Sequence, residues 1–322
     1  MSIAFLYPGQ GAQKVGMGKD LHDAFESARR VFGLAEEAAG LPIRQLCFEG
    51  PEQQLSRTDV GQPAIFAVSA AALAVMEELL GPDRLASIRP SYMAGLSLGE
   101  YTALYAAGAI DLQPAVKLVA RRGQLMQQAA TAKPSGMLCV MGLDEAGADQ
   151  LVAAAAQCEP LTCANFNCPG QIVLSGSLDA CARAEQMARD FGASGAVKLN
   201  VAGAFHSELM APAAEQFADA LQEADFRRPT TPVVSNVDGQ PYAHPAEIRR
   251  KLLAQLTAPV RWQQSMRWIL GTGVRRFYEI GPGRVLAGLM RRIDRSGQVV
   301  CLNSERAIRK LAETPQPAHE ME

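Results

Sequence analysis

The chain has no excess of either charge and contains few histidines. The balanced charge argues against some classes of partner, and the few histidines limit the candidates for a catalytic base. Its 322 residues carry 31 Lys and Arg against 33 Asp and Glu, a formal net charge of -2. No basic stripe indicates a nucleic-acid-binding surface, and no block of like charge indicates an interaction tail. We therefore expect no nucleic-acid partner. With only four histidines, a mechanism that needs a histidine base has few candidates.

A long apolar run and a secretion signal are also missing. The most apolar stretch, residues 64–80, contains Ser69, Glu77 and Glu78 and is shorter than the ~20 residues of a bilayer-spanning helix. It predicts a buried helix instead. The first residues have no basic segment and soon meet Pro8 and Gly9, which is not typical of a signal peptide. We expect a soluble, cytoplasmic monomer with no membrane partner.

Seven cysteines, an odd number, are typical of reduced thiols in a cytosol rather than of a disulfide framework. Cys163 and Cys168 have no second cysteine pair or histidine nearby, so we expect no metal site. The glycine-rich segment at residues 8–13 lacks the Lys-Ser/Thr of a phosphate-binding loop. It also lacks the third glycine of a dinucleotide-binding turn. We expect no cofactor.

Strands and helices alternate along most of the chain, which indicates a largely parallel sheet covered on both faces. The expected strands are residues 3–7, the residues before Gly95, 233–236, 275–280 and 299–302. The expected helices are residues 20–39, 63–80, 100–107, 114–130, 207–224 and 245–256, with another beginning near Arg284.

The organisation changes after a cluster of structure-breaking residues at 133–136. The expected elements that follow are a strand at 137–141, a helix at 144–157, strands at 161–165 and 171–175, a helix at 178–191 and a strand at 196–201. This is the β-α-β-β-α-β order of a ferredoxin-like unit. The predicted fold is therefore an α/β-hydrolase-like core, residues 1–135 and 202–312, with an inserted ferredoxin-like subdomain at residues 136–201. The polar tail, residues 313–322, is predicted to be disordered.

The segment Gly95-Leu96-Ser97-Leu98-Gly99 connects an expected strand to an expected helix. A serine on such a sharp turn has its Oγ exposed, and glycines on both sides remove the Cβ atoms that would collide there. The helix that follows directs backbone N–H groups and its positive end toward the place where an oxyanion would form. The pattern predicts that Ser97 is a nucleophile. An incidental serine in a glycine-rich turn is the alternative.

His206 is the best candidate for the base that a serine nucleophile needs. It follows the inserted segment on a loop of small residues, where it would face a cleft. The other histidines are poorer candidates, because His22 begins a surface-like helix, His244 lies in a turn and His319 lies in the tail. A histidine that caps the next helix is the alternative. No acidic residue stands out as a third triad member, which leaves a backbone or amide oxygen to orient His206.

Arg122 lies on the flank of the apolar face of the 114–130 helix. A guanidinium directed into a pocket would hold a carboxylate through two hydrogen bonds, which suits an acyl group with a distal carboxylate. An arginine that extends along a helix edge to solvent is the alternative. Gln10 follows the first strand, at the sheet edge where ligands bind in open α/β folds. The backbone N–H groups of Gln10 and Leu98 would form an oxyanion hole.

Six segments occur together in one order and spacing: Pro8-Gly9-Gln10-Gly11-Ala12-Gln13, Gly95-Leu96-Ser97-Leu98-Gly99-Glu100-Tyr101, Arg122-Gly123, Asn167-Cys168-Pro169-Gly170-Gln171, Ala204-Phe205-His206-Ser207 and Gln255-Leu256-Thr257-Ala258-Pro259-Val260. On these segments the chain resembles the malonyl-CoA:acyl carrier protein transacylases, from residue 3 to about residue 301. The resemblance implies a two-subdomain fold and these roles: acylation of Ser97, a base at His206, an oxyanion hole at Gln10 and Leu98, and substrate binding at Arg122, Gln255 and Asn167, with Gln255 also orienting His206.

The implied reaction transfers malonyl from malonyl-CoA to the phosphopantetheine thiol of acyl carrier protein, through a ping-pong route with no metal or redox cofactor, in support of fatty acid synthesis. One position departs from the family, which usually has His where this chain has Leu96. We expect this change to affect the rate and the details of the carboxylate pocket more than the reaction class. The alternatives are an acyltransferase that serves a polyketide synthase or malonate decarboxylase, a serine hydrolase, and a non-catalytic acyl binder.

Overall fold

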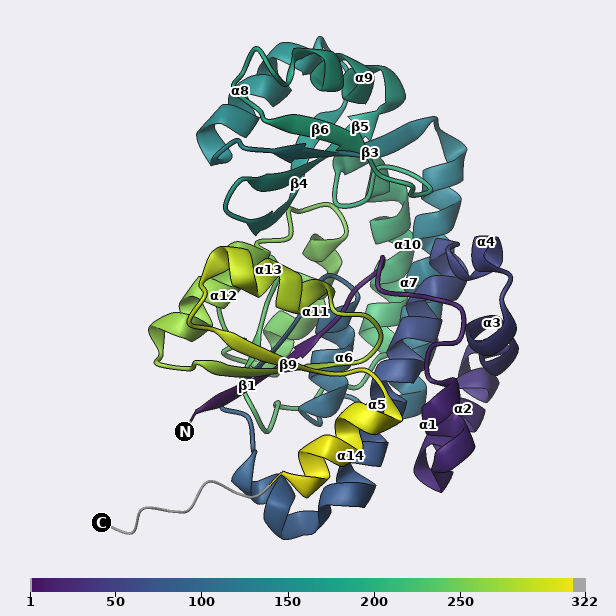
Figure 1. Ribbon diagram of the computed structural model, residues 1–322. Helices are drawn as coiled ribbons and strands as arrows, with labels where there is room; N and C mark the ends of the chain where they lie inside the picture. The colour runs from purple at the N-terminus through teal and green to yellow at the C-terminus, as the bar shows by residue number, and fades with distance from the viewer. Residues whose placement is uncertain (1, 315–322) are drawn as a thin grey trace.

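The computed structural model describes residues 2–314 and contains two sheets of different kinds (Figure 1). The larger sheet has the order β7-β2-β1-β8-β9, and all of its strand pairs are parallel. The smaller sheet has the order β4-β5-β3-β6 and is antiparallel. The strands are β1 (Ile3–Tyr7), β2 (Tyr92–Gly95), β3 (Ser135–Met141), β4 (Leu161–Cys168), β5 (Gln171–Ser177), β6 (Gly195–Lys198), β7 (Val233–Val234), β8 (Arg276–Ile280) and β9 (Gln298–Leu302).

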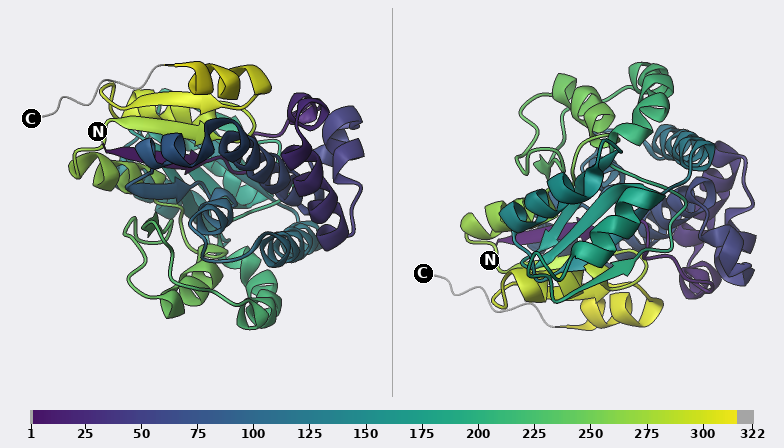
Figure 2. Two further views of the ribbon diagram at one scale, coloured as in Figure 1. Left: turned by 90° about the horizontal axis from the view of Figure 1, so that it is seen from below. Right: turned by 90° about the horizontal axis from the view of Figure 1, so that it is seen from above.

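Helices cover both faces of the parallel sheet and one face of the antiparallel sheet (Figures 1 and 2). They are α1 (Lys19–Ala24), α2 (Glu26–Ala39), α3 (Ile43–Glu49), α4 (Glu52–Leu55), α5 (Thr58–Ser87), α6 (Gly99–Ala106), α7 (Leu112–Ala132), α8 (Glu145–Ala156), α9 (Leu178–Met187), the 3₁₀ helix η1 (Glu208–Met210), α10 (Ala211–Glu223), α11 (Pro245–Gln255), α12 (Trp262–Gly271), α13 (Val285–Ile293) and α14 (Glu305–Glu313). The expected α/β fold with one parallel sheet is confirmed.

The central strand β1 explains why the parallel sheet has two cores. Successive side chains of a strand point to opposite faces, and all five β1 residues are buried. Ile3, Phe5 and Tyr7 pack in the core formed with α2, α5, α6 and α7. Ala4 and Leu6 pack in the second core, with α12 and α13. Such two-sided burial gives a parallel strand its continuous apolar sequence.

The parallel arrangement brings two loops of the chain together at one sheet edge. Tyr7 lies beside Gly95 in the register of β1 and β2. The Leu96 backbone N–H donates to the Tyr7 carbonyl over 3.1 Å. The loop after β1 and the turn after β2 therefore lie side by side, and the antiparallel sheet lies above them (Figures 1 and 2).

The longest helix, α5, begins and ends outside the predicted residues 63–80. It extends from Thr58 to Ser87, and Gly81 interrupts it with φ 66° and ψ 172°. The predicted end of this helix at residue 80 is thus a kink between two helical segments. By length and composition α5 could cross a membrane, but 72% of its most apolar window is buried inside the protein. Its apolar character is that of a core helix, as expected.

Other boundaries differ because tertiary contacts, rather than local patterns, decide them. The expected helix at 20–39 is two helices, since Phe25 between them is extended. Helices α3, α4, α12 and α14 were not anticipated. Strand β4 continues to Cys168 through two register irregularities against β5. Helix α14 extends to Glu313, the first residue of the predicted disordered tail, and the tail from residue 315 lies outside the described residues.

Candidate active site

Ser97 occupies the turn between β2 and α6, and its geometry explains the flanking glycines. Its φ is 51°, in the left-handed region that few non-glycine residues adopt. A Cβ at Gly95 would come within 1.9 Å of the Gly99 backbone, and one at Gly99 within 2.1 Å of the Tyr7 carbonyl oxygen. The Ser97 backbone N–H donates to Asn236 Oδ1 over 2.5 Å. Glycines at these two positions allow the tight turn, and Asn236 holds Ser97 in it.

His206 lies beside the Ser97 hydroxyl. Its Nε2 is 2.8 Å from Ser97 Oγ, and its Nδ1 is 2.7 Å from the backbone carbonyl oxygen of Gln255. Because a carbonyl only accepts, Nδ1 carries the proton and Nε2 is left to accept one from the serine. Burial and, to a smaller extent, the Arg122 charge lower the pKa of His206 to about 4, although the hydrogen bond to the Gln255 carbonyl raises it. The imidazole is therefore neutral near pH 7, as a general base requires.

Arg122 is buried in α7, with 1% of its surface exposed, so the helix-edge alternative is wrong. Its Nη2 donates to Ser97 Oγ over 3.1 Å and to Gln255 Oε1 over 2.9 Å. Its Nη1 donates to Gln62 Oε1 over 2.6 Å. Burial lowers the pKa of Arg122. No carboxylate within residues 2–314 forms an ion pair with it, which leaves its charge available to an anionic ligand.

A buried polar network supports these three residues from behind. Gln255, with 1% of its surface exposed, donates through Nε2 to the Ser97 carbonyl over 3.1 Å and to Glu100 Oε2 over 2.5 Å. Glu100 also accepts from the Asn236 backbone N–H over 3.2 Å and from the Tyr242 hydroxyl. Burial raises the pKa of Glu100 to about 7, against these hydrogen bonds and the Arg122 charge.

Sequence reasoning missed Gln62, Glu100, Asn236 and Tyr242. Gln62 and Asn236 contact the site from sequence separations of 60 and 139 residues, and such separations leave no local signal. Glu100 did carry a signal, since it is the charged residue of the short and otherwise uncharged helix α6. A carboxylate there needs buried partners.

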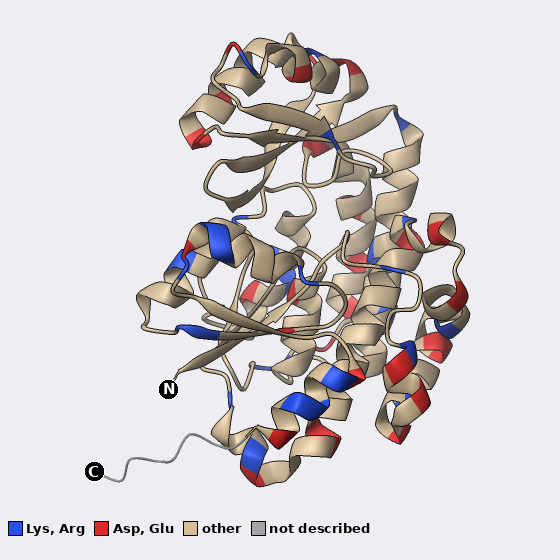
Figure 3. Ribbon diagram, viewed as in Figure 1, with Lys and Arg blue, Asp and Glu red and all other residues tan. Residues whose placement is uncertain are grey.

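A cavity of about 370 Å³ opens at Ser97, within the range of small-ligand sites. We call the parallel sheet with its helices the large unit, and the antiparallel sheet with α8, α9 and the segment after β6 the small unit. The large unit lines the cavity with Gln10, Leu96, Leu98, Arg122 and His206. The small unit lines it with Asn165, Asn167, Gln171, Val173 and Leu199. A larger cavity of about 580 Å³ lies around Arg261 and Arg267 but contains neither Ser97 nor His206. We therefore take the smaller cavity as the site. Figure 3 shows most charged residues on the outer helices and turns of both units.

The expected oxyanion-hole residues lie on this cavity. Gln10 and Leu98 both line it, and Gln10 Nε2 is turned toward Thr58 Oγ1 at 3.3 Å. In the described part of the chain, neither the Gln10 nor the Leu98 backbone N–H has a hydrogen-bond acceptor. Two unpaired donors beside a nucleophile are what an oxyanion requires.

Asn167 and Gln255 differ in their relation to the cavity, although the resemblance assigned both to substrate binding. Asn167 belongs to the part of β4 that extends beyond the predicted strand, and it lines the cavity. Gln255 is not among the lining residues. Its contacts are with Ser97, Arg122, His206 and Glu100, so it can act on a ligand only through them.

The other described histidines lie away from Ser97. His22 is in the last turn of α1, not at the start of a surface helix. Its ring centroid is 5.2 Å from Phe48 and 5.9 Å from Phe32. Both of its ring nitrogens are buried without a hydrogen-bond partner among residues 2–314. His244 precedes α11 as its N-cap, as the predicted turn implied, and His319 lies outside the described residues.

The fold and site define a class: an α/β protein with a serine–histidine pair built for acyl chemistry. The model of the family described as acyl transferase domain matches residues 4–307. A malonyl CoA-acyl carrier protein transacylase of Bacillus subtilis strain 168 is 39% identical over 313 residues, 97% of this chain and 96% of that protein. The chain belongs to the malonyl CoA-acyl carrier protein transacylase family of acyltransferases, which confirms the resemblance.

Solved structures of similar proteins support the same family assignment. The malonyl-CoA:acyl carrier protein transacylase of Xanthomonas oryzae pv. oryzae is 38% identical, with a TM-score of 0.91 over 97% of this chain and 99% of that one. The malonyl-transacylase PlMCAT, solved in complex with the type II PKS acyl-carrier protein AntF, is also 38% identical, with a TM-score of 0.92 and the same coverage.

Proposed function

We propose that this chain transfers the malonyl group of malonyl-CoA to the phosphopantetheine thiol of an acyl carrier protein, through a malonyl ester on Ser97. One observation carries the proposal. Ser97 Oγ lies 2.8 Å from His206 Nε2 and 3.1 Å from Arg122 Nη2. A nucleophile, its base and a buried cation thus converge on one cavity. The names of the relatives and of the solved neighbours support the same reaction.

In the first half-reaction, Ser97 Oγ attacks the thioester carbonyl and its proton passes to His206 Nε2. The Gln10 and Leu98 N–H groups bind the oxyanion of the tetrahedral intermediate. The intermediate collapses by breaking the carbon–sulfur bond, and the CoA sulfur takes the proton from His206. In the second half-reaction, the carrier thiol gives its proton to His206 and attacks the ester carbon. Ser97 Oγ then leaves and recovers the proton.

Arg122 would bind the malonyl carboxylate. In a malonyl ester the carboxylate is one methylene away from the ester carbon, so a cation within hydrogen-bond distance of Ser97 Oγ is suitably placed. Gln62 and Gln255 each accept one hydrogen bond from the guanidinium, which fixes its plane. Asn167 would contact the substrate from the opposite wall. We assign Gln255 to positioning, because its side chain contacts Arg122 and its backbone carbonyl contacts His206.

A serine hydrolase is less well supported than a transferase. The acceptor of the His206 Nδ1–H is a backbone carbonyl, not a carboxylate. A buried Arg122 directed at Ser97 has no purpose in releasing acyl groups to water. As for pathway, we propose fatty acid synthesis. A polyketide carrier is the second candidate, favoured by the likeness to the PlMCAT:AntF complex.

We also infer that the smaller sheet, with α8 and α9, is a ferredoxin-like unit inserted into a hydrolase-like core. The strand order β4-β5-β3-β6 supports this inference, and β3 moves the first boundary from residue 136 to Ser135. The cytoplasmic location, the monomeric state and the absence of membrane or cofactor partners remain predictions. Cell fractionation, light scattering and elemental analysis of the active protein test them.

Intact-mass analysis tests the proposed function. Brief incubation with malonyl-CoA should add one malonyl group, and peptide mapping should place it on Ser97. Addition of an acyl carrier protein bearing phosphopantetheine should then remove the group and malonylate the carrier. Ser97→Ala should abolish both steps. Labelling of Cys47, Cys139 or another serine would overturn the assignment, and a panel of fatty-acid and polyketide carriers would identify the preferred partner.

A further inference from the structure

The buried positive charge of Arg122 has no carboxylate of the described residues in direct contact with it. The guanidinium is buried, and its hydrogen-bond acceptors are the amide oxygens of Gln62 and Gln255 and the Ser97 hydroxyl. Burial of an uncompensated charge is costly. The Gln255 amide links Arg122 to a carboxylate, that of Glu100. Its oxygen accepts from Arg122, and its nitrogen donates to Glu100 Oε2 over 2.5 Å. Arg122 and Glu100 are thus opposite charges that make no direct ion pair and are bridged by one amide group.

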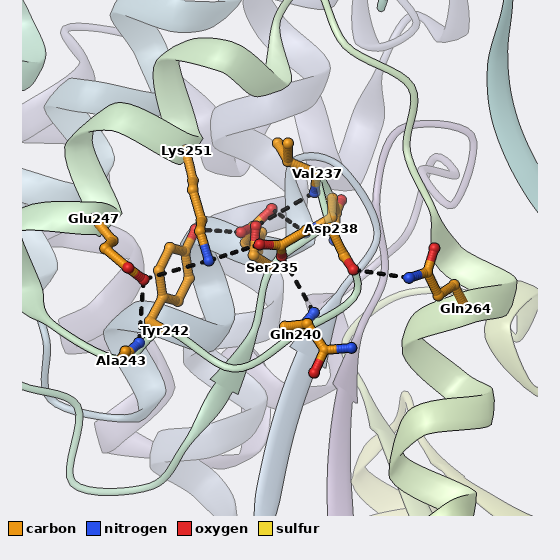
Figure 4. A network of polar contacts seen from close by, with 11 residues as sticks. Ser235, Val237, Asp238, Gln240, Tyr242, Ala243, Glu247, Lys251 and Gln264 are labelled. Atoms are coloured by element: carbon orange, nitrogen blue, oxygen red, sulfur yellow. Dashed lines mark hydrogen bonds and ion pairs between the residues drawn. The ribbon is translucent and has the colours of Figure 1, made fainter.

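Among the described residues, Arg122 is the one cation that acts on the Glu100 carboxylate. The remaining donors to that carboxylate are the neutral Asn236 backbone N–H and the neutral Tyr242 hydroxyl. Lys251 lies beyond Tyr242, 5.3 Å from the ring centroid, and its charge is matched separately. Lys251 Nζ is 2.8 Å from Asp238 Oδ2 and 3.3 Å from Glu247 Oε2 (Figure 4). The negative charge of Glu100 is therefore directed to Arg122.

The interposed amide has a physical consequence for ligand binding. A carboxylate in direct contact with Arg122 would occupy the guanidinium and compete with an anionic substrate. Coulomb energy falls with distance, so a carboxylate one amide away offsets the burial of the cation but competes less with a ligand. The same amide also directs its oxygen, and not its nitrogen, toward Arg122. The hydrogen bonds from its nitrogen to Glu100 and to the Ser97 carbonyl together fix that orientation.

We propose that Glu100 is a positioning residue that sets the selectivity of the site for carboxylated acyl groups: it helps to orient the Gln255 amide and places the counter-charge of Arg122 one amide away. The proposal rests on the proposed function, because the carboxylate in question is that of malonyl. It also explains why a fully buried acid occurs three residues after the nucleophile. Glu100 acts through Gln255 and contacts no reacting atom.

An exchange of the two side chains tests the placement of the charge. The double variant Glu100→Gln/Gln255→Glu keeps one carboxylate, one amide and the net charge, but it puts the carboxylate in direct contact with Arg122. The concentration of malonyl-CoA that half-saturates Ser97 acylation should rise roughly tenfold or more. That of acetyl-CoA, which has no distal carboxylate, should rise by a clearly smaller factor, because only the loss of the Gln255 hydrogen bond to the Ser97 carbonyl affects it. Single-turnover acylation at a pH above 7, where Glu100 is mainly ionised, followed by intact mass measures both donors.

The single variant Glu100→Gln should move malonyl binding in the opposite direction. Its amide oxygen can accept from Gln255 and Asn236, and its NH₂ can donate to the Tyr242 oxygen, so mainly the charge is lost. Without that charge, Arg122 should attract the malonyl carboxylate more strongly. The half-saturating concentration should fall roughly three- to tenfold for malonyl-CoA and stay constant for acetyl-CoA. If the double variant does not fold, the result for Glu100→Gln tests the proposal by itself. If Glu100→Gln does not fold, the result for the double variant does so.

Glu279→Gln is the matched control, because Glu279 is also a buried carboxylate, but it accepts from the Leu286 and Ala287 backbone N–H groups. This variant should not change the half-saturating concentration of malonyl-CoA relative to that of acetyl-CoA. A merely structural role for Glu100 predicts that both of its variants weaken malonyl and acetyl acylation by one common factor, and that result would overturn the proposal. A wild-type chain that is never malonylated would instead refute the proposed function.

Discussion

The two units of the molecule contribute to the cavity in different ways. The unit with the parallel sheet supplies Ser97, Arg122 and His206, whose positions are fixed by hydrogen bonds. The residues of the antiparallel unit that line the cavity carry no charge, and Asn167 and Val173 are representative. One unit therefore holds the chemistry and the other supplies a neutral wall. Substitutions in the two units should differ in kind as well as in size.

The largest effect should follow from the loss of the base in the parallel unit. His206→Ala removes the acceptor of the Ser97 proton and should lower kcat/KM for malonyl transfer by about 10²–10⁴-fold. Stopped assays of malonyl transfer from labelled malonyl-CoA to carrier protein measure it. A loss of less than about threefold would show that His206 is structural and would weaken the contrast between the units.

The next largest effect should follow from Arg122→Ala. The lost charge-assisted contact is worth about 2–5 kcal/mol, roughly 30-fold or more in malonyl transfer. Acetyl transfer should be unchanged or faster, because acetyl has no carboxylate to bind. Parallel assays with the two donors make the comparison. Equal losses for both donors would assign Arg122 a structural role only.

Leu96→His should have a smaller effect, although Leu96 adjoins the nucleophile. Leu96 packs against the second core of the parallel unit, and a leucine side chain makes no hydrogen bonds. We expect kcat/KM to change by less than about tenfold, or ~1.4 kcal/mol. If the wild type is inactive with every carrier and the variant restores transfer, the chain is instead a degenerate member of its family.

Asn167→Ala, in the antiparallel wall, should have a still smaller effect. It removes one neutral polar group from the cavity and should lower kcat/KM by less than about fivefold, chiefly through KM. A double-mutant cycle with Arg122→Ala checks whether the two units act independently. A large kcat effect of Asn167→Ala would contradict the division between chemistry and wall.

The last prediction concerns stability rather than rate. Burial raises the pKa of Glu100 from 4.5 to about 7, so the folded state binds a proton that the unfolded state has lost. The stability of the wild type relative to Glu100→Gln should therefore fall as pH rises from about 4.5 through about 7. His206 titrates in both proteins, so its contribution cancels. Urea unfolding at several pH values measures the difference, and a constant difference would contradict the raised pKa.

Much of the fold follows from local patterns. The alternation of strands and helices predicted the parallel sheet, and the residues near 135–201 predicted every element of the smaller sheet in its order. Short helices such as α3 and α4 and the break at Phe25 were missed. Their limits depend on packing against α5 and other distant elements, and such contacts leave no periodic signal in so few residues.

The site could be predicted in part for the same reason. Ser97 is marked by its glycines, and His206 is marked by the scarcity of histidines, so both were found from sequence. Whether Arg122 faced solvent or a pocket was left open. The helix pattern placed it on a flank, whereas its complete burial and its contact with Ser97 depend on how α7 packs against its neighbours.

The sequence alone determined the serine turn, the candidate base and the expected family, because these depend on residue types at short spacings. Only the tertiary structure decided that the Gln255 backbone carbonyl orients His206 and that an amide separates Arg122 from Glu100. Gln255 meets Arg122 across 133 residues and Glu100 across 155 residues. Whether a buried charge is compensated depends on which groups lie near it in space, and only the folded chain determines those neighbours.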